Sequence, residues 1–327
     1  MANKIVSGLL LFLLIAVNAG ASDSVLFLET QMVGGYSSLQ NQTVYYSMDS
    51  NHALQKPSVG IDYFRKISSG SGEWGTLSFQ GRVAHDDAND NHIETQIYNA
   101  YIQHDFWFGD IWAGHNKPSF GLNAALDSRA ALIQTLTAEG LGFGWDWGAG
   151  YYTQFSGGDI SVSFTSGSGF MMYYQGNYLF STRFSYGILN KDNYSIGLSF
   201  SNGNIFDMVD YHRLSDTLYS ATSGGVDFSW NIKKIELKCE SIIGSMGCND
   251  INGTLVRVGY NLLKDNRMKL ELQPMVSSTI DNGQDYKIYS GITYMLSRFF
   301  TIRAMYEYNH FNNDHLTIGQ LYYYGLI

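Results

Sequence analysis

Charged residues are scarce in this sequence, and long apolar runs are nearly absent. Only 15% of the 327 residues are Asp, Glu, Lys or Arg, against about 25% in ordinary globular domains. After the first 21 residues, no apolar run approaches the roughly 20 residues that a membrane-spanning helix needs. These absences argue against an ordinary soluble domain and against a helical membrane protein.

Aromatic residues, by contrast, are abundant. They make up 15% of the chain, with 24 Tyr and 19 Phe. A soluble β-sandwich rarely combines so many tyrosines with so few charges. A transmembrane β-barrel has a use for both features, because its outer band faces lipid and is bounded by two girdles of aromatic side chains. Composition therefore favours an exported β-barrel.

Cysteine is also scarce, with Cys239 and Cys248 nine residues apart across a predicted loop. In an oxidising compartment the two could form a disulfide. They could equally stay two thiols, one facing lipid from a strand, because spacing alone does not fix the geometry of a disulfide. Neither has CxxC spacing or a neighbouring histidine, so no metal or cofactor site is predicted.

The formal net charge is −9, which argues against a nucleic-acid partner. If the protein is a channel, an acidic chain slightly favours the passage of cations. The residues that line a pore decide its selectivity, however, so the sequence leaves the preferred ion and the solute open.

The first 21 residues are typical of a secretory signal peptide. Lys4 precedes an apolar stretch from Ile5 to Val17, and Ala19-Gly20-Ala21 supplies the small residues that a signal peptidase recognises. The stretch is shorter than a transmembrane anchor. We therefore expect export, cleavage after Ala21, and one mature domain from 22 to 327.

From about Val25 onward, segments of about ten residues alternate in polarity, as in 178–187, 194–201, 268–273 and 300–308. Successive side chains of a strand point to opposite faces. The apolar set is therefore predicted to face lipid, and the polar set to line a water-filled interior. The charged candidates for this inner wall are Arg183, Arg257, Lys269, Glu271, Arg303 and Glu307.

Turn residues give the number of strands. Seven short turns are predicted, at 68–73, 108–110, 156–159, 190–193, 231–234, 264–267 and 296–298. Longer connections alternate with them, near 37–56, 85–93, 115–140, 166–175, 202–222, 245–252, 279–285 and 309–314. We therefore predict an all-β protein, a transmembrane antiparallel β-barrel of about sixteen strands. A barrel of this size encloses an aqueous channel.

The third long connection interrupts the strand pattern. The run GHNKPSFGL (114–122) leads into a stretch of apolar residues at three- and four-residue spacing, followed by Gly140. The members of this stripe are Leu122, Leu126, Ala130, Ile133 and Leu136. The spacing predicts a helix over 124–139 with Gly140 as its C-cap. Such a helix fits poorly at an exposed tip, so we expect the loop, about 115–140, to fold inward and constrict the barrel.

The same run carries a resemblance to a known family. IWAGHNKPSFGL resembles the Gram-negative outer-membrane porins of the general diffusion and phosphate-selective type, in which a strand ending in Gly runs into a Lys/Thr-Pro-Phe-Gly-Leu segment. The matching residues are Gly114, Lys117, Pro118, Phe120, Gly121 and Leu122, with Ser119 inserted. The resemblance implies an outer-membrane homotrimer, in contact with lipid and lipopolysaccharide, that passes small hydrophilic solutes and ions by passive diffusion. The terminal Ile327 departs from the pattern, because such barrels usually end in an aromatic residue.

Pore diameter and the charges at the narrowest point control permeation through such a channel. The third loop supplies the candidate constriction residues His115, Lys117, Asp127, Arg129 and Glu139. Porins commonly set acidic loop residues against a basic wall, which implies a transverse field that orients dipolar solutes. The alternative is that many wall charges form ion pairs between strands and only stabilise the wall.

Two other functions stay open from the sequence. Asp210-Tyr211-His212 and Asp86-Asp87 resemble the carboxylate–histidine groups of omptin-type outer-membrane proteases, which could activate water to cleave a peptide. Those proteases have about ten strands, fewer than the turns predict here, so a channel without enzymatic activity is favoured. A structural or adhesive barrel plugged by the third loop would have the same fold.

Overall fold

The computed structural model of the chain describes residues 24–44, 55–69, 72–86, 92–124, 130–209, 212–279 and 283–327. The predicted signal peptide, 1–21, lies outside these ranges. None of the helices within them is long and apolar enough to cross a membrane. Most of the described chain is strand, which confirms the predicted all-β class.

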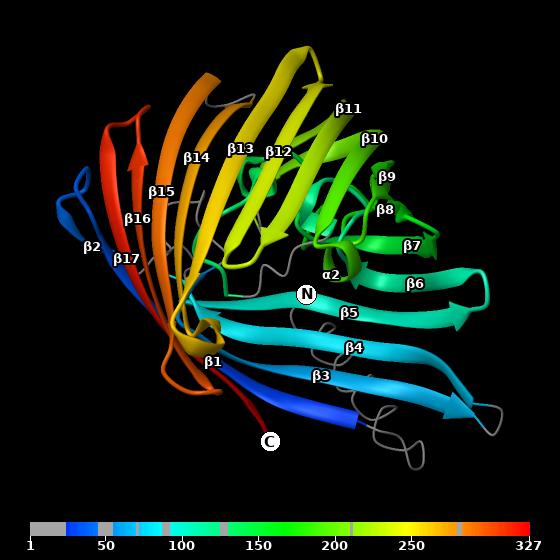
Figure 1. Ribbon diagram of the computed structural model, residues 1–327. Helices are drawn as coiled ribbons and strands as arrows, with labels where there is room; N and C mark the ends of the chain where they lie inside the picture. Colours follow the sequence, from blue (N-terminus) through cyan, green and yellow to red (C-terminus); the bar gives the residue numbers. More distant parts are fainter. Residues whose placement is uncertain are drawn as a thin grey trace.

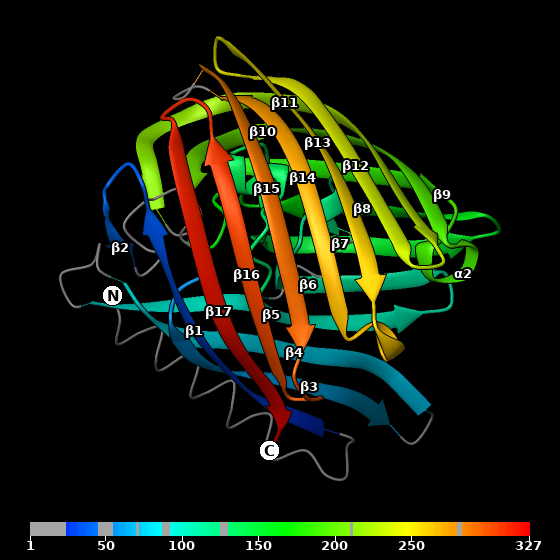
Figure 2. The same ribbon diagram turned by 60° about the vertical axis from the view of Figure 1, so that its left-hand side comes forward.

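Sixteen long strands form a closed antiparallel barrel, as the sequence predicts (Figure 1). Each strand pairs with the next, and β1 pairs with both β3 and β17, which closes the sheet (Figure 2). A short extra strand, β2 (Gln42–Val44), pairs with β1. The long strands are β1 (Ser24–Ser37), β3 (Ser58–Ser69), β4 (Gly72–His85), β5 (Ile93–Phe106), β6 (Gly109–Asn116), β7 (Asp146–Phe155), β8 (Gly158–Thr165), β9 (Tyr178–Tyr186), β10 (Tyr194–Val209), β11 (His212–Ile232), β12 (Ile235–Met246), β13 (Asn249–Leu262), β14 (Met268–Thr279), β15 (Gly283–Met295), β16 (Phe300–Asn309) and β17 (Asp314–Leu326).

The seven predicted short turns all join consecutive strands, and we call their end of the barrel the turn end and the opposite end the loop end. Two helical turns, α2 (Leu189–Asp192) and η4 (Lys264–Asn266), lie at the turn end.

Two of the predicted long loops are wrong. The stretch 202–222 is mostly strand, because its polar residues continue the pairing of β10 with β11, as in Asn202 opposite Thr222. The stretch 245–252 contains only a tight turn at Gly247, whose positive φ of 62° suits glycine.

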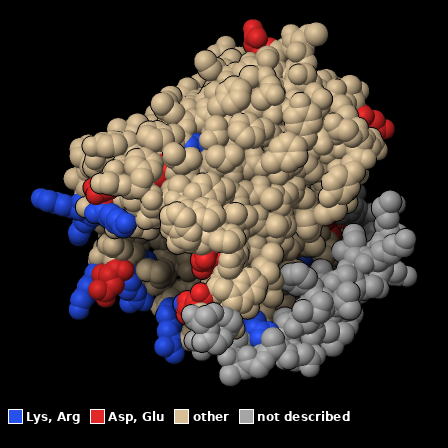
Figure 3. Space-filling model, turned by 90° about the vertical axis from the view of Figure 1, so that its right-hand side faces the viewer, with Lys and Arg blue, Asp and Glu red and all other residues tan. Residues whose placement is uncertain are grey.

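The two faces of the wall differ as the alternation predicts. In β9, Phe180 and Phe184 are exposed on the outside, whereas Ser181 and Arg183 are buried on the inside. The side of the molecule in Figure 3 carries few charged residues over most of its area, and charged side chains gather at its edge. The outside of the barrel is therefore a broad apolar surface.

Several charged residues of the inner wall are paired with one another. The guanidinium of Arg183 donates to both carboxylate oxygens of Asp227 on β11, at 2.9 and 2.7 Å. Near the loop end, the ammonium of Lys56 lies 2.8 Å from Asp86 and 2.9 Å from Glu94. All five side chains are buried. For these residues the geometry favours a role in holding the wall together, which was the alternative to a role in selectivity.

We predict that Asp227→Asn lowers the free energy of unfolding by about 3 kcal/mol, because it leaves the buried Arg183 guanidinium without its main partner. Equilibrium guanidinium unfolding of the protein in lipid vesicles would measure this loss. Lys66→Gln is the matched control, since it breaks an exposed pair with Glu73 that contributes less than about 1 kcal/mol. Equal losses for the two variants would contradict the prediction.

Candidate pore constriction

The third loop leaves the wall after β6 and returns to it at β7, and its described part lies inside the barrel (Figure 1). Wall side chains hold its backbone by hydrogen bonds. The amide of Gly121 donates to the Ser199 hydroxyl on β10 (2.9 Å), and the amide of Leu122 donates to a carboxylate oxygen of Glu240 on β12 (2.8 Å). The loop therefore crosses the lumen and is fixed to strands far from its origin.

Two wall residues of β13 and β14 hold the middle of the loop. Arg257 donates to the carbonyl oxygens of Ile133 (3.2 Å) and Gln134 (2.9 Å). Gln273 donates to the same Gln134 carbonyl at 2.9 Å. Since these carbonyls are satisfied by the wall, the loop needs no helix to satisfy them.

The continuous helix predicted over 124–139 is wrong in the described part of that range. The loop has two 3-10 turns, η2 (Leu122–Ala124) and η3 (Leu136–Glu139), and 130–135 are not helical. Ala130 has a positive φ of 52°, which a right-handed helix does not allow. Gly140 does cap η3 in a left-handed conformation, as predicted.

The apolar stripe of the loop packs against the inner wall. Leu122, Ile133 and Leu136 lie in one buried cluster with side chains from the strands. The members from β12 onward are Ile242, Met246, Ile251, Leu255, Met275, Tyr289, Met305, Leu316 and Ile318. The expectation of a wholly polar inner wall is therefore wrong over β12–β17, where the loop covers an apolar patch.

Glycines in the wall receive the loop side chains. A Cβ on Gly253 would overlap the Cδ1 atom of Leu141 and lie 2.9 Å from Cδ2 of Leu136. A Cβ on Gly291 would lie 2.9 Å from Cδ1 of Ile133. Real Cβ atoms essentially never approach this closely, so each glycine leaves space that apolar side chains of the loop fill. The sequence signal was a glycine at an inward position of a strand, and it was missed.

Two of the predicted constriction residues do not meet the lumen as expected. His115 is fully buried, and its ring centroid lies 4.7 Å from that of Trp147 and 5.5 Å from that of Phe170. The carboxylate of Glu139 accepts two hydrogen bonds from Lys287 of β15, at 2.9 and 2.8 Å. Lys287 was not predicted to contribute, although its inward register follows from the same alternation.

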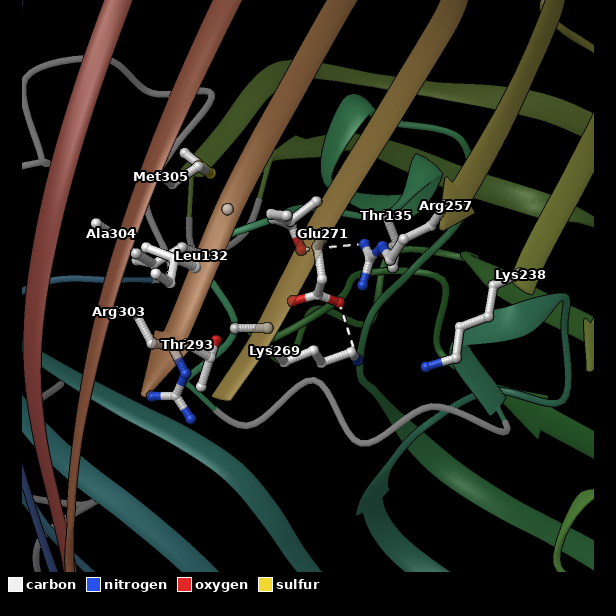
Figure 4. Close-up of a pocket in the computed structure, with 14 residues that line it drawn as sticks. Leu132, Thr135, Lys238, Arg257, Lys269, Glu271, Thr293, Arg303, Ala304 and Met305 are labelled. Carbon is white, nitrogen blue, oxygen red and sulfur yellow. Dashed lines mark hydrogen bonds and ion pairs between the residues drawn. The ribbon is translucent and has the colours of Figure 1, made fainter. Parts of the chain in front are cut away.

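One open cavity of about 220 Å³ separates the loop from the wall (Figure 4). The loop side is neutral and is formed by Ala131, Leu132, Ile133 and Thr135. The wall side is charged and is formed by Lys238, Arg257, Lys269, Glu271 and Arg303. Four of the six predicted wall residues thus line one cavity, together with Lys238.

Basic groups outnumber acidic ones around this cavity. The ammonium of Lys269 bridges Glu236 (2.8 Å) and Glu271 (3.0 Å), and the Lys238 ammonium lies 3.6 Å from Glu236. Four cationic side chains line the space with a single carboxylate, Glu271. Of the other two wall candidates, Glu307 is buried outside this cavity and Arg183 lines a second one.

A second cavity of about 400 Å³ lies between the start of the loop and the turn end. Lys117 lines it together with Asp110, Asp159 and Arg183. The Lys117 ammonium lies 5.2 Å from the ring centroid of Trp145, close enough for a cation–π attraction. Lys117 is thus the one predicted constriction residue, among those described, that lines an open space.

The remaining candidate residues from the sequence either lie outside the described residues or are buried in an ion pair. Asp127, Arg129, Asp87 and Asp210 belong to the undescribed segments, as does the side chain of His212. Asp86 is buried and pairs with Lys56, so it is not placed to activate water.

Cys239 and Cys248 are both free thiols. Cys239 lies seven residues before the end of β12 at Met246, a span of roughly 23 Å along a strand. A disulfide needs a Cα separation below about 7 Å. The predicted alternative of two unpaired thiols therefore holds, and the possible disulfide does not form.

Comparisons with known proteins concern the fold. The barrel is similar to OmpF of Salmonella typhi in complex with daunomycin, with a TM-score of 0.65, 13% identity, and coverage of 93% of this chain and 98% of that one. It is similar to the outer membrane channel DcaP of Acinetobacter baumannii (TM-score 0.64, 11% identity, 94% and 99% covered). It is also similar to an anion-selective porin from Comamonas acidovorans (TM-score 0.62, 11% identity, 94% and 100% covered). This chain has the porin fold.

The sequence itself matches no known protein family and no curated protein. The porin-like fold predicted from the third-loop motif is thus confirmed by structure. The sequence identities are too low to indicate the function.

We predict that Gly253→Val displaces the third loop from the wall and raises the single-channel conductance, because the new side chain occupies the space of Leu136 and Leu141. Gly319→Val is the control, since the nearest atom to its Cβ, the Gly34 carbonyl oxygen, lies 4.0 Å away. Planar-bilayer recordings would compare the two. An unchanged conductance in a folded Gly253→Val protein would show that the loop does not set the width of the pore.

Proposed function

We propose that this protein is a porin, a water-filled channel for the passive diffusion of small hydrophilic solutes and ions across the outer membrane of a Gram-negative bacterium. The observation that carries the proposal is the pair of open cavities beside the third loop, both on its turn-end side and both lined by charged side chains inside a closed sixteen-strand barrel. Charged walls keep such spaces hydrated, and hydrated spaces conduct ions.

The outer surface supports the membrane location. Outward positions carry exposed apolar residues on strand after strand, among them Phe184, Leu198, Val226, Leu272 and Ile302. Exposing this surface to water would be unfavourable by roughly 25 cal/mol for each Å². A lipid environment removes that penalty. Outer-membrane lipid and lipopolysaccharide would provide such an environment.

Solutes would cross down their own gradients, with no step of bond chemistry. The third loop narrows the lumen and is held by hydrogen bonds and apolar contacts, so the path is fixed in width. In the cavity of Figure 4, the four cations outnumber the carboxylates Glu236 and Glu271 beside them and would attract anions, and the neutral loop would add no opposing charge. We therefore propose a preference for anions, although the net charge of the chain is negative.

A homotrimer is part of the proposal. One similar structure is the trimer form of OmpT, an outer membrane protein of Vibrio cholerae, with a TM-score of 0.63 and 10% identity over 93% of this chain and all of that one. Trimeric assembly would present three parallel channels, and conductance steps in multiples of three would report it.

The two rival functions have less support from the geometry. A protease site would need Asp86 free to act on water, and its carboxylate is instead paired with the Lys56 ammonium. A plugged structural barrel would need the loop to fill the lumen, whereas open cavities of about 220 and 400 Å³ lie beside the loop toward the turn end. We propose a non-enzymatic channel.

We predict stable ohmic current steps when the purified mature protein is added to a planar lipid bilayer under a salt gradient. The reversal potential should have the sign expected for anion preference. Folding should be verified in the same sample by the shift in electrophoretic mobility on heating. A folded sample without conductance would contradict the channel and favour the plugged barrel.

We further predict that Lys238→Glu and Lys117→Glu each shift the reversal potential toward cation preference, because each replaces a cation lining a cavity by an anion. Lys66→Glu makes the same change of charge at an exposed site on β3, and should leave the reversal potential close to that of the wild type. An unchanged potential for either lumen variant would remove that residue from the ion path.

A further inference from the structure

Four successive connections at the turn end carry most of the exposed basic residues of the described chain. These are the turns after β9, β11, β13 and β15. We call their six cations the basic turns, and all six are exposed: Lys191, Lys233, Lys234, Lys264, Arg267 and Arg298. Only Asp192 and Asp265 oppose them in the same turns.

The charges of the basic turns are not neutralised within the molecule. None of the six forms an ion pair with a carboxylate in the part of the chain that the structure describes. Lys191 donates to the side-chain amide oxygen of Gln154 at 3.2 Å, and Arg267 donates to the carbonyl oxygens of Met295 and Leu296. These neutral partners orient the side chains and leave the positive charge unbalanced.

Aromatic residues lie directly next to the basic turns on the outward face. They occupy the last or first outward positions of the same strands: Tyr186, Tyr194, Trp230, Tyr260, Tyr294 and Phe300. The guanidinium of Arg267 lies 5.9 Å from the ring centroid of Tyr294, and that of Arg298 lies 4.5 Å from the ring of Phe299. The cations therefore stand at the outer rim, beside the barrel wall, and not over the lumen.

The opposite end of the same strands has the opposite charge. Toward the loop end, strands β10 to β15 carry Asp207, Asp216, Asp250 and Asp285, with Arg213 and Lys287 as the nearby cations among the described residues. Arg213 is itself paired with Asp216. Over strands β9–β16 the barrel thus has basic turns at one end and a net acidic opposite end.

We propose that the basic turns bind anionic phospholipid headgroups of the leaflet that surrounds the turn end. The inference rests on the proposed membrane location and goes beyond channel function. Aromatic side chains sit at the level of the headgroups, so cations just beyond them meet the phosphates. Each such cation is attracted to an anionic membrane surface.

The spacing of the basic turns fits lipids better than one bound ligand. Neighbouring turns are two strands apart, which is about 10 Å, so the four turns form an arc of roughly 30 Å. A single small ligand would contact one turn, whereas a row of headgroups contacts all four. We therefore assign the arc to several phosphatidylglycerol-like lipids and not to a soluble anion.

The test compares lipid preference in reconstituted vesicles. The protein is placed in phosphatidylcholine vesicles, and electron spin resonance measures the motionally restricted fraction of spin-labelled phosphatidylglycerol and of spin-labelled phosphatidylcholine. We expect phosphatidylglycerol to be preferred about fivefold, the equivalent of about 1 kcal/mol, and 1 M salt to weaken the preference. The neutralised variant carries four Lys→Gln changes: Lys191→Gln, Lys233→Gln, Lys234→Gln and Lys264→Gln.

The neutralised variant should lose most of the preference, and the matched variant with Lys→Arg at the same four positions should keep it. A preference that survives neutralisation, or that is absent from the wild type, would overturn the proposal. The same vesicles can be mixed with an acidic soluble protein. If the vesicles retain that protein but show no preference for phosphatidylglycerol, the proposal is overturned in favour of a protein partner. Bilayer conductance of the same preparations tests the channel separately, because none of the four lysines lines either cavity.

Discussion

The buried contact between the third loop and the inner wall is the feature on which the lumen depends. Leu132, Ile133 and Leu136 pack against Leu255, Met275 and their neighbours on the wall. Burying one such leucine contributes roughly 1.5–3 kcal/mol of stabilisation. The whole cluster therefore stabilises the structure more than any single ion pair nearby. Hydrogen bonds from Arg257 and Gln273 then fix the direction of the loop backbone.

The position of the loop also decides which wall charges matter. Where the loop covers the wall, inward positions are apolar or are neutralised, as Lys287 is by Glu139. Where it stands away from the wall, Lys238 and Arg303 line the open cavity, together with Lys269, which bridges Glu236 and Glu271. In the proposed channel, the same segment would therefore set both the width of the passage and the sign of its charge. The arrangement differs from an acidic loop facing a basic wall, because the facing loop residues here are uncharged.

Much of the barrel was predictable from the sequence, because strand alternation and short turns are local signals. The turns at 156–159 and 264–267, for example, lie where their Gly, Asp and Asn residues indicate. The third loop was predictable in place but not in conformation. Its apolar residues have helical spacing, yet they follow the shape of a wall contributed by residues more than a hundred positions away. Likewise, nothing near Glu139 in the sequence indicates Lys287 as its partner, and the burial of His115 depends on Phe170 from another loop.

The distance along the chain between the loop and its contacts has a consequence for the order of assembly. The loop belongs to the first half of the sequence, and it binds Glu240, Arg257, Gln273 and Lys287. In these four hydrogen bonds the wall residue lies 118 to 148 residues after its loop partner. Contacts between such distant residues require the intervening chain to be ordered first, since closing a long loop is entropically unfavourable. The surface that receives the loop exists only once β12–β15 have curled round to face β6. The passage therefore acquires its final width as the last strands join the first, and curling of the sheet and seating of the loop become one late, cooperative event.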